Sequence, residues 1–98
     1  MAAPGNPGIA ALVRCLPVDL TSPADVLALA EREAVDLTVV GPEAPLELGL
    51  ADAFRAAGHP ILGPGRQGAA LECSKVHSKQ FMARHGISTA RFSVCETV

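Results

Sequence analysis

The sequence has few aromatic residues and no long hydrophobic segment. Its 98 residues include three Phe and neither Trp nor Tyr, so a core has to be built from Ala, Val, Leu and Ile. No apolar run approaches the roughly 20 residues that a helix needs to cross a bilayer. The N-terminus lacks the basic start and unbroken apolar stretch of a signal peptide. We therefore expect a soluble, cytoplasmic protein without a membrane partner.

Excess charge and paired cysteines are also missing. The formal net charge is −2 and no block of like charges occurs, so no nucleic-acid partner is expected. Cys15, Cys73 and Cys95 are odd in number, widely spaced and typical of reduced cytoplasmic thiols. Cys73 and His77 have a spacing that suits a metal ion, but no second ligand pair accompanies them. We expect no metal site.

What is present is an alternation of strand and helix patterns. Short apolar runs predict strands at residues 13–19, 36–41, 59–63 and 91–98. Helical patterns lie at 21–34, 44–58 and 66–86, the last with a break near Cys73-Ser74, whereas the Pro- and Gly-rich residues 3–8 indicate a loop. This order predicts an α/β fold with a parallel sheet and flanking helices.

Two local signals refine this picture. Ser22 followed by Pro23 predicts the start of the first long helix, because Ser caps helix N-termini and Pro fits the first helical position. The unbroken apolar run at 36–41 predicts a strand that is buried on both faces.

Ligands of open parallel sheets bind beyond the carboxyl ends of the strands. Gly41, Pro42 and Glu43 follow the strand at 36–41 and therefore belong to that edge. Glu43 could accept a hydrogen bond from a hydroxyl or amine of a polar ligand there. The plainer alternative, which spacing alone favours, is a glutamate that balances the helix dipole.

Gly63, Gly65 and Gly68 form a G-x-G-x-x-G pattern between a strand and a helix. The backbone amides of this turn could hold an anion, with Arg66 as a partner. A dinucleotide-binding module would need an acidic residue roughly 20 residues further on, at the end of the next strand. The next such residue, Glu96, lies 28 positions past Gly68, so a coincidental match is favoured.

Lys75 and Lys79 lie four residues apart on one predicted helix face. Like charges at this spacing repel each other unless an anion lies between them. A phosphate would relieve the repulsion, and two solvated lysines are the alternative. No Ser/His/Asp set is present that would support nucleophilic catalysis, so no catalytic residue is assigned.

Taken together, several segments resemble one known family. "APGNPG", "DLTVVGPEAPLELGLADAFRAAG", "LECSK" and "SKQFMARHGISTARF" are similar, in order and from about residue 3 to the end, to the start of the glycinamide ribonucleotide synthetases. These enzymes are also called phosphoribosylamine–glycine ligases. The separation between "VVGPEAPL" and "FMARHGI" makes the resemblance more specific than a single glycine pattern.

The resemblance implies a function and a set of roles. The family consists of ATP-grasp ligases of purine biosynthesis that join phosphoribosylamine to glycine through glycyl phosphate, using ATP and Mg²⁺. It implies a Rossmann-like, pre-ATP-grasp domain over residues 1–90 and the start of the ATP-grasp region at 91–98. By this resemblance Asn6 and Gly8 lie in a substrate-side loop, Gly41, Pro42 and Glu43 line the adjacent cleft, and Lys75 is directed toward ATP.

The chain also departs from the family pattern. The first strands and the glycine-rich phosphate loop of the family have no counterpart here, so we expect this fragment to be inactive alone and to bind ATP and Mg²⁺ weakly at best. Edges beside the strand at 36–41 would then be open to self-association. The alternatives are a non-catalytic remnant or partner-binding α/β module, the N-terminal domain of another ATP-grasp ligase, and a small dinucleotide-binding module.

Overall fold

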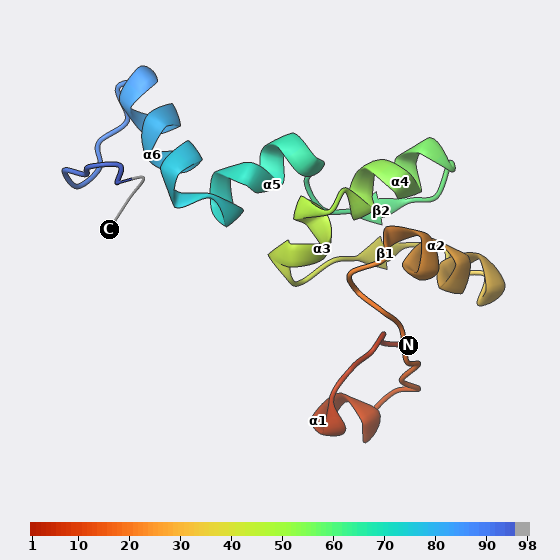
Figure 1. Ribbon diagram of the computed structural model, residues 1–98. Coiled ribbons are helices and arrows are strands. Elements are labelled where there is room, and N and C mark those ends of the chain that lie inside the picture. The colour runs from red at the N-terminus through yellow and green to blue at the C-terminus, as the bar shows by residue number, and fades with distance from the viewer. Residues whose placement is uncertain (96–98) are drawn as a thin grey trace.

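A computed structural model describes residues 1–95 and shows a mixed α/β arrangement (Figure 1). The elements in chain order are α1 (Pro7–Ala10), α2 (Pro23–Arg32), β1 (Thr38–Val39), α3 (Glu43–Glu47), α4 (Leu50–Ala56), β2 (Ile61–Leu62), α5 (Arg66–Cys73) and α6 (Lys75–Arg84). This order confirms the predicted alternation of strands and helices through the middle of the chain.

β1 and β2 form a small parallel sheet, as the alternation predicts. Thr38 pairs with Ile61, and Val39 pairs with Leu62. The sheet extends slightly past the strand ends, because the Val40 amide donates to the Leu62 carbonyl at 3.1 Å. Within residues 1–95 the other β-structure is an isolated parallel bridge between Ala2 and Cys15. The Rossmann-like strand order stays a prediction.

The core lies on one face of this sheet, beneath α2 and α4. One cluster contains Val26 and Ala30 of α2 with Leu50 and Phe54 of α4, and Phe54 is fully buried. A second cluster joins α3, α4 and α5 through Leu46, Ala51 and Ala69. Val40 and Ile61 pack against both clusters, so the covered face of the sheet connects them.

The start of α2 follows the sequence signals. The hydroxyl of Ser22 accepts the amide of Asp25 at 3.3 Å, and Pro23 is the first helical residue. A cap of this kind satisfies one of the amides that the first helical turn leaves without an intrahelical partner. The predicted N-terminus of this helix is confirmed.

Two predictions for the N-terminal region are wrong. Residues 13–19 do not form a strand, and only Cys15 takes part in a bridge. Val13 is 42% exposed, and although Val18 packs against the core, the run has within residues 1–95 no neighbouring strand beyond the bridge at Cys15 to hold it extended. The expected loop at residues 3–8 ends in α1, because Pro7 occupies the first helical position, where its missing amide costs nothing, and Asn6 caps the helix.

The middle and C-terminal regions bring three further corrections. The helix expected over 44–58 is divided into α3 and α4 at Gly49. The φ of Gly49 is 90°, in the left-handed region, and a residue in that conformation interrupts a right-handed helix. The strand at 36–41 is covered on one face only, since Val39 is 65% exposed. Residues 91–95 of the expected last strand have no regular structure, and its remaining residues, 96–98, lie outside the described part. The predicted break near Cys73-Ser74 is confirmed.

Candidate functional site

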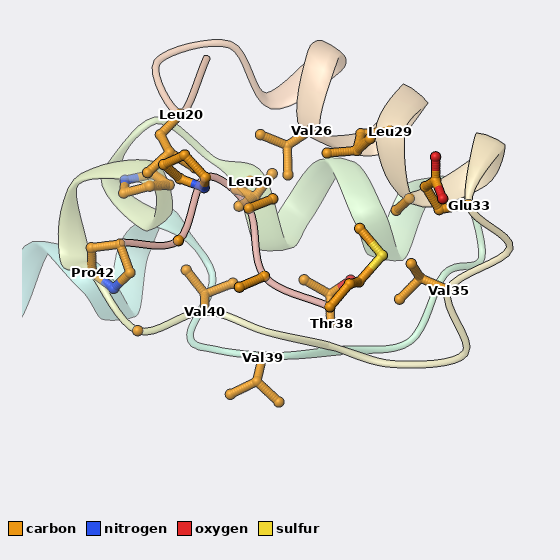
Figure 2. Close-up of a pocket in the computed structure, with 18 of the residues that line it drawn as sticks. Leu20, Val26, Leu29, Glu33, Val35, Thr38, Val39, Val40, Pro42 and Leu50 are labelled. Carbon is orange, nitrogen blue, oxygen red and sulfur yellow. The ribbon is translucent and has the colours of Figure 1, made fainter. Parts of the chain in front are cut away.

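A groove of about 830 Å³ lies beside β1 (Figure 2). Its floor is apolar and comes from the side chains of α2 and α4, while residues 1–6 and 35–42 form its walls. In Figure 2 Val26, Leu29 and Leu50 gather on the core side of β1, whereas Val39 points to the opposite side. The groove therefore lies between the core, the edge of β1 and the N-terminal segment.

Three of the candidate substrate-side residues line this groove together: Asn6, Gly41 and Pro42. The side-chain oxygen of Asn6 accepts the Ile9 amide at 2.9 Å and caps α1, so its orientation is fixed. None of the hydrogen bonds of residues 1–95 uses the Asn6 side-chain NH₂ group. A Cβ atom built on Gly41 meets no atom within 4 Å, which leaves space at the carboxyl end of β1.

The other candidates lie outside the groove. Gly8 is exposed within α1, Glu43 is exposed at the start of α3, and Lys75 is exposed at the start of α6. The Cys73 sulfur lies 3.8 Å from the Glu43 carbonyl oxygen. This contact joins the end of α5 to the start of α3, and it brings the chain segment before Lys75 close to Glu43.

The surroundings of Cys73 are apolar and acidic. Burial raises the pKa of the Cys73 thiol, and the carboxylates of Glu47, Glu43 and Glu72 raise that pKa further. A thiol with a raised pKa is a weak nucleophile at neutral pH, because the thiolate is the reactive form. Cys73 packs against the cluster of Leu46, Ala51 and Ala69 that joins α3, α4 and α5.

In the turn before α5, a carboxylate of the protein occupies the place where an external anion could bind. The carboxylate of Asp52, on α4, accepts the Arg66 amide at 2.8 Å at the first residue of α5. The Arg66 guanidinium donates to the Glu47 carbonyl at 2.8 Å instead of facing a ligand. The Arg66 amide and guanidinium, which could have held an external anion at this turn, thus both have acceptors within the protein.

Close packing accounts for the three glycines of the G-x-G-x-x-G pattern. A Cβ atom on Gly63 would lie 2.9 Å from a methyl group of Leu46, and one on Gly65 would lie 2.5 Å from Asp52 Oδ1. A Cβ atom on Gly68 would lie 3.1 Å from the ring of Pro64. Each glycine has an internal reason, which supports the coincidental match over a dinucleotide-binding loop.

Comparison with known protein families shows which family the chain belongs to. Residues 1–72 match the family model described as phosphoribosylglycinamide synthetase, N domain. The chain belongs to this family. Its apolar core, the groove and the turn before α5 all lie within the matched residues.

Individual relatives agree with this assignment. A phosphoribosylamine–glycine ligase of Xylella fastidiosa (strain Temecula1) is 56% identical over 94 residues, which cover 94% of this chain and 22% of the relative. Ligases of the same name from Ralstonia nicotianae and Chlorobaculum tepidum are 54% and 50% identical over 92% and 94% of this chain. The chain spans about a fifth of the length of these relatives.

Beyond the residues matched by the family model, Lys79 has partners within the chain. Its ammonium group donates to the Thr89 hydroxyl at 2.6 Å and to the Ala90 carbonyl at 3.3 Å. It also lies 5.9 Å from the centre of the Phe92 ring, at cation–π distance. These contacts favour the simpler interpretation of the lysine pair, because Lys79 needs no phosphate between itself and Lys75.

Residues 1–95 lack two further features that would bear on function. Among residues 1–95, no group of three or more His, Cys, Asp or Glu residues is placed to hold a metal ion. None of the described helices has the length and apolar character to cross a membrane. The sequence alone did not indicate Asp52. Its carboxylate accepts a hydrogen bond from the amide of Arg66, which lies 14 positions later, and no local sequence pattern connects the two residues.

Proposed function

We propose that the chain forms the substrate-side N-terminal domain of an ATP-dependent, cytoplasmic phosphoribosylamine–glycine ligase of purine biosynthesis. In this proposal residues 1–90 form a Rossmann-like, pre-ATP-grasp domain, and 91–98 begin the ATP-grasp region. Glycyl phosphate, formed elsewhere in the ligase, reacts with phosphoribosylamine held by this domain. The shared name of relatives that are 50–56% identical supports the activity.

The groove beside β1 carries the assignment of the substrate side. Asn6, Gly41 and Pro42 meet there at the carboxyl end of a parallel strand, where ligands of open sheets bind. The NH₂ group of Asn6 can donate to a ribose hydroxyl or a phosphate oxygen. Gly41 allows a ligand to approach the backbone because no side chain occupies that space. Gly8 and Glu43 would contribute from the borders of this region.

Residues 1–95 offer no complete site for ATP and Mg²⁺. The N-terminus of α5 is occupied by Asp52, and residues 1–95 contain no cluster of metal ligands. Lys75 is an exposed cation at the start of α6, which could contact a nucleotide only as one part of a larger site. The proposal therefore assigns binding and positioning to this chain, and it predicts no catalysis by the 98 residues alone.

Other functions are less well supported. The N-terminal domain of a different ATP-grasp ligase would not explain why the relatives share one name. A dinucleotide-binding module lacks an open glycine loop, since Asp52 and Leu46 fill the space beside Gly65 and Gly63. The open edge of β1 favours partner binding as an additional property.

Ribose 5-phosphate, a stable analogue of phosphoribosylamine, tests the substrate side. In an ¹⁵N NMR titration, the amides of Asn6 and Gly41 should shift, while those of Gly58 and Gly86 on distant turns should not. Asn6→Ala should weaken binding about tenfold, because it removes one hydrogen bond to the ligand. The matched amide control, Gln67→Ala on the exposed side of α5, should bind like the unmodified chain. Unchanged spectra, or equal losses in both variants, would contradict the proposal.

Catalysis by the isolated chain is tested separately. The 98-residue protein is mixed with phosphoribosylamine, glycine, ATP and Mg²⁺, and ADP release is followed. We expect no ADP above the rate without protein, because no group of His, Cys, Asp or Glu residues in 1–95 is placed to hold the metal ion. ADP release that depends on both phosphoribosylamine and glycine would overturn the assigned role.

A further inference from the structure

The chain reverses its direction after α6 and returns beside that helix (Figure 1). Gly86 has a φ of 64°, in the left-handed region, where glycine avoids the steric cost of a side chain. The next amide, that of Ile87, donates to the Met82 carbonyl at 2.9 Å, which is the hydrogen bond that defines a Schellman helix end. This turn directs residues 87–92, the return segment, back along α6.

Packing and backbone pairing contribute little to the position of the return segment. Residues 83–95 are all exposed, so the segment buries little apolar surface against α6. No backbone group of residues 88–92 forms a hydrogen bond with another backbone group within residues 1–95. The position of the segment beside α6 therefore has to come from side-chain contacts.

The side chain of Lys79 supplies these contacts from the middle of α6. Its ammonium group donates to the Thr89 hydroxyl at 2.6 Å and to the Ala90 carbonyl at 3.3 Å. The same group lies 5.9 Å from the centre of the Phe92 ring. Within residues 1–95, no other hydrogen bond or ion pair joins residues 88–92 to the rest of the molecule. One half-buried lysine thus makes contacts that are spread over the return segment.

We propose that Lys79 acts as a latch, which holds the return segment against α6 and so fixes the direction in which the chain continues after the helix. Hydrogen bonds from a charged donor are stronger than those between neutral groups, so one ammonium group can hold a segment that packs poorly. The sequence from Lys75 to Cys95 contains neither Asp nor Glu, so no carboxylate of α6 or of the return segment competes for this group.

Lys75, one helical turn before Lys79, gives an internal comparison. Its side chain is exposed, and no hydrogen bond or ion pair within residues 1–95 uses its ammonium group. The two lysines therefore have the same charge and the same helix but different surroundings. The latch itself does not depend on the ligase assignment. That it would orient the ATP-grasp region beginning at 91–98 relative to α6 rests on the proposed function.

Cleavage after Arg91 by an arginine-specific protease measures how often the return segment opens, because a protease acts on chain that has left the folded surface. Lys79→Met removes the ammonium group but keeps an unbranched side chain of similar helix propensity. This variant should be cleaved after Arg91 at least about fivefold faster than the unmodified chain. Lys75→Met, the matched control, removes the same charge from the same helix and should change this rate by less than about twofold. Cleavage after Arg55 in α4 reports on the core and should be equal in all variants.

A second pair of variants tests the acceptor side without changing α6. Thr89→Val replaces the hydroxyl group by a methyl group and should speed cleavage after Arg91 by about threefold. The hydroxyl of the neighbouring Ser88 forms no hydrogen bond within residues 1–95. Ser88→Ala should therefore leave the rate within about twofold of the unmodified chain. If Lys79→Met loses its helical circular dichroism, this second pair decides alone.

Combining the substitutions shows whether the two side chains act on each other. The double variant Lys79→Met and Thr89→Val should be cleaved no faster than Lys79→Met, because both changes break the same contact. Equal rates after Arg91 in Lys79→Met and Lys75→Met would overturn the latch, and so would equal rates in Thr89→Val and Ser88→Ala. Multiplied effects in the double variant would also contradict it. No ligand is present in these measurements, so their failure is distinct from a failure of the groove to bind ribose 5-phosphate.

Discussion

The middle of the molecule and its two ends are built in different ways. Every buried hydrophobic side chain of the described core lies between Val26 and Ala69, whereas α1 and α6 bury none. Figure 1 shows both ends extending away from the layers formed by α2, the sheet and α4. The radius of gyration is 16.7 Å, compared with about 13 Å for a compact domain of this length. The difference indicates a small core that carries two weakly attached segments.

The ion pairs and hydrogen bonds of the ends are largely exposed. Arg14 forms an ion pair with Glu33, the residue after α2, and Lys79 binds Thr89 and Ala90 within the C-terminal segment itself. Exposed ion pairs typically contribute about 0–1 kcal/mol, much less than the burial of one large apolar side chain. We therefore expect the ends to open without unfolding of the middle, and changes in the two regions to have different consequences.

The largest difference is expected for phenylalanines in the two regions. Phe54→Ala should reduce the free energy of unfolding by about 3–5 kcal/mol, because Phe54 is fully buried and its removal leaves a cavity in the core. Phe92→Ala, the control at a 40% exposed position of the C-terminal segment, should change it by less than about 0.5 kcal/mol. Urea unfolding followed by circular dichroism measures both. Similar losses would show that the ends belong to the same cooperative unit.

The same comparison explains which fold predictions succeeded. The start of α2, the parallel pairing and the break at Ser74 follow from local signals that the packed middle reinforces. The apolar run at 13–19 has the composition of a strand, but composition is not enough without a neighbouring strand to pair with. The break at Gly49 was missed because apolar spacing continues through it, while the turn accompanies the packing of α3 against α5, which lies later in the chain.

A smaller difference in the free energy of unfolding is expected between alanine substitutions at Gly65 and at Gly41. Both glycines lie within residues 1–72, which match the family model. Gly65→Ala should cost about 1–3 kcal/mol, because the new Cβ atom would lie 2.5 Å from Asp52 Oδ1. Gly41→Ala is the matched control and should cost less than about 0.5 kcal/mol, since no atom lies within 4 Å and no positive φ is required. The two substitutions thus distinguish a packing glycine from a glycine that borders open space.

A double-mutant cycle identifies the cause at Gly65. Asp52→Ala alone should cost about 0.5–2 kcal/mol, because α5 loses the carboxylate that accepts the Arg66 amide. In the Asp52→Ala background, Gly65→Ala should change the free energy of unfolding little, since the clashing carboxylate is gone. The coupling energy between the two substitutions should then nearly equal the loss caused by Gly65→Ala alone. Additive losses would mean that something other than Asp52 requires this glycine.

The site shows the same limits of sequence reasoning. The placement of Gly41 and Pro42 at a strand end follows from local patterns, and the structure puts them on the groove. That Asn6 would meet them was implied only by the family resemblance, because residues 1–6 reach the groove through long-range contacts such as the Arg14–Glu33 pair. Asp52 at the α5 turn had no signal at all. Long-range polar contacts, which depend on the packed fold, were the part that local patterns could not supply.

The smallest effect concerns two helix caps of the same chemistry. Ser22→Ala should reduce the free energy of unfolding by about 1 kcal/mol, because Ser22 caps α2, which packs on the core. Asn6→Ala removes a cap with a shorter hydrogen bond, 2.9 Å against 3.3 Å, yet α1 buries no residue. If α1 opens independently, its cap contributes to that local equilibrium and not to global unfolding.

Urea unfolding should therefore detect only Ser22→Ala, whereas hydrogen exchange should show faster exchange of the Ile9 amide in Asn6→Ala. A loss of global stability in Asn6→Ala would place α1 within the cooperative core and remove the distinction between the two regions at the N-terminal end.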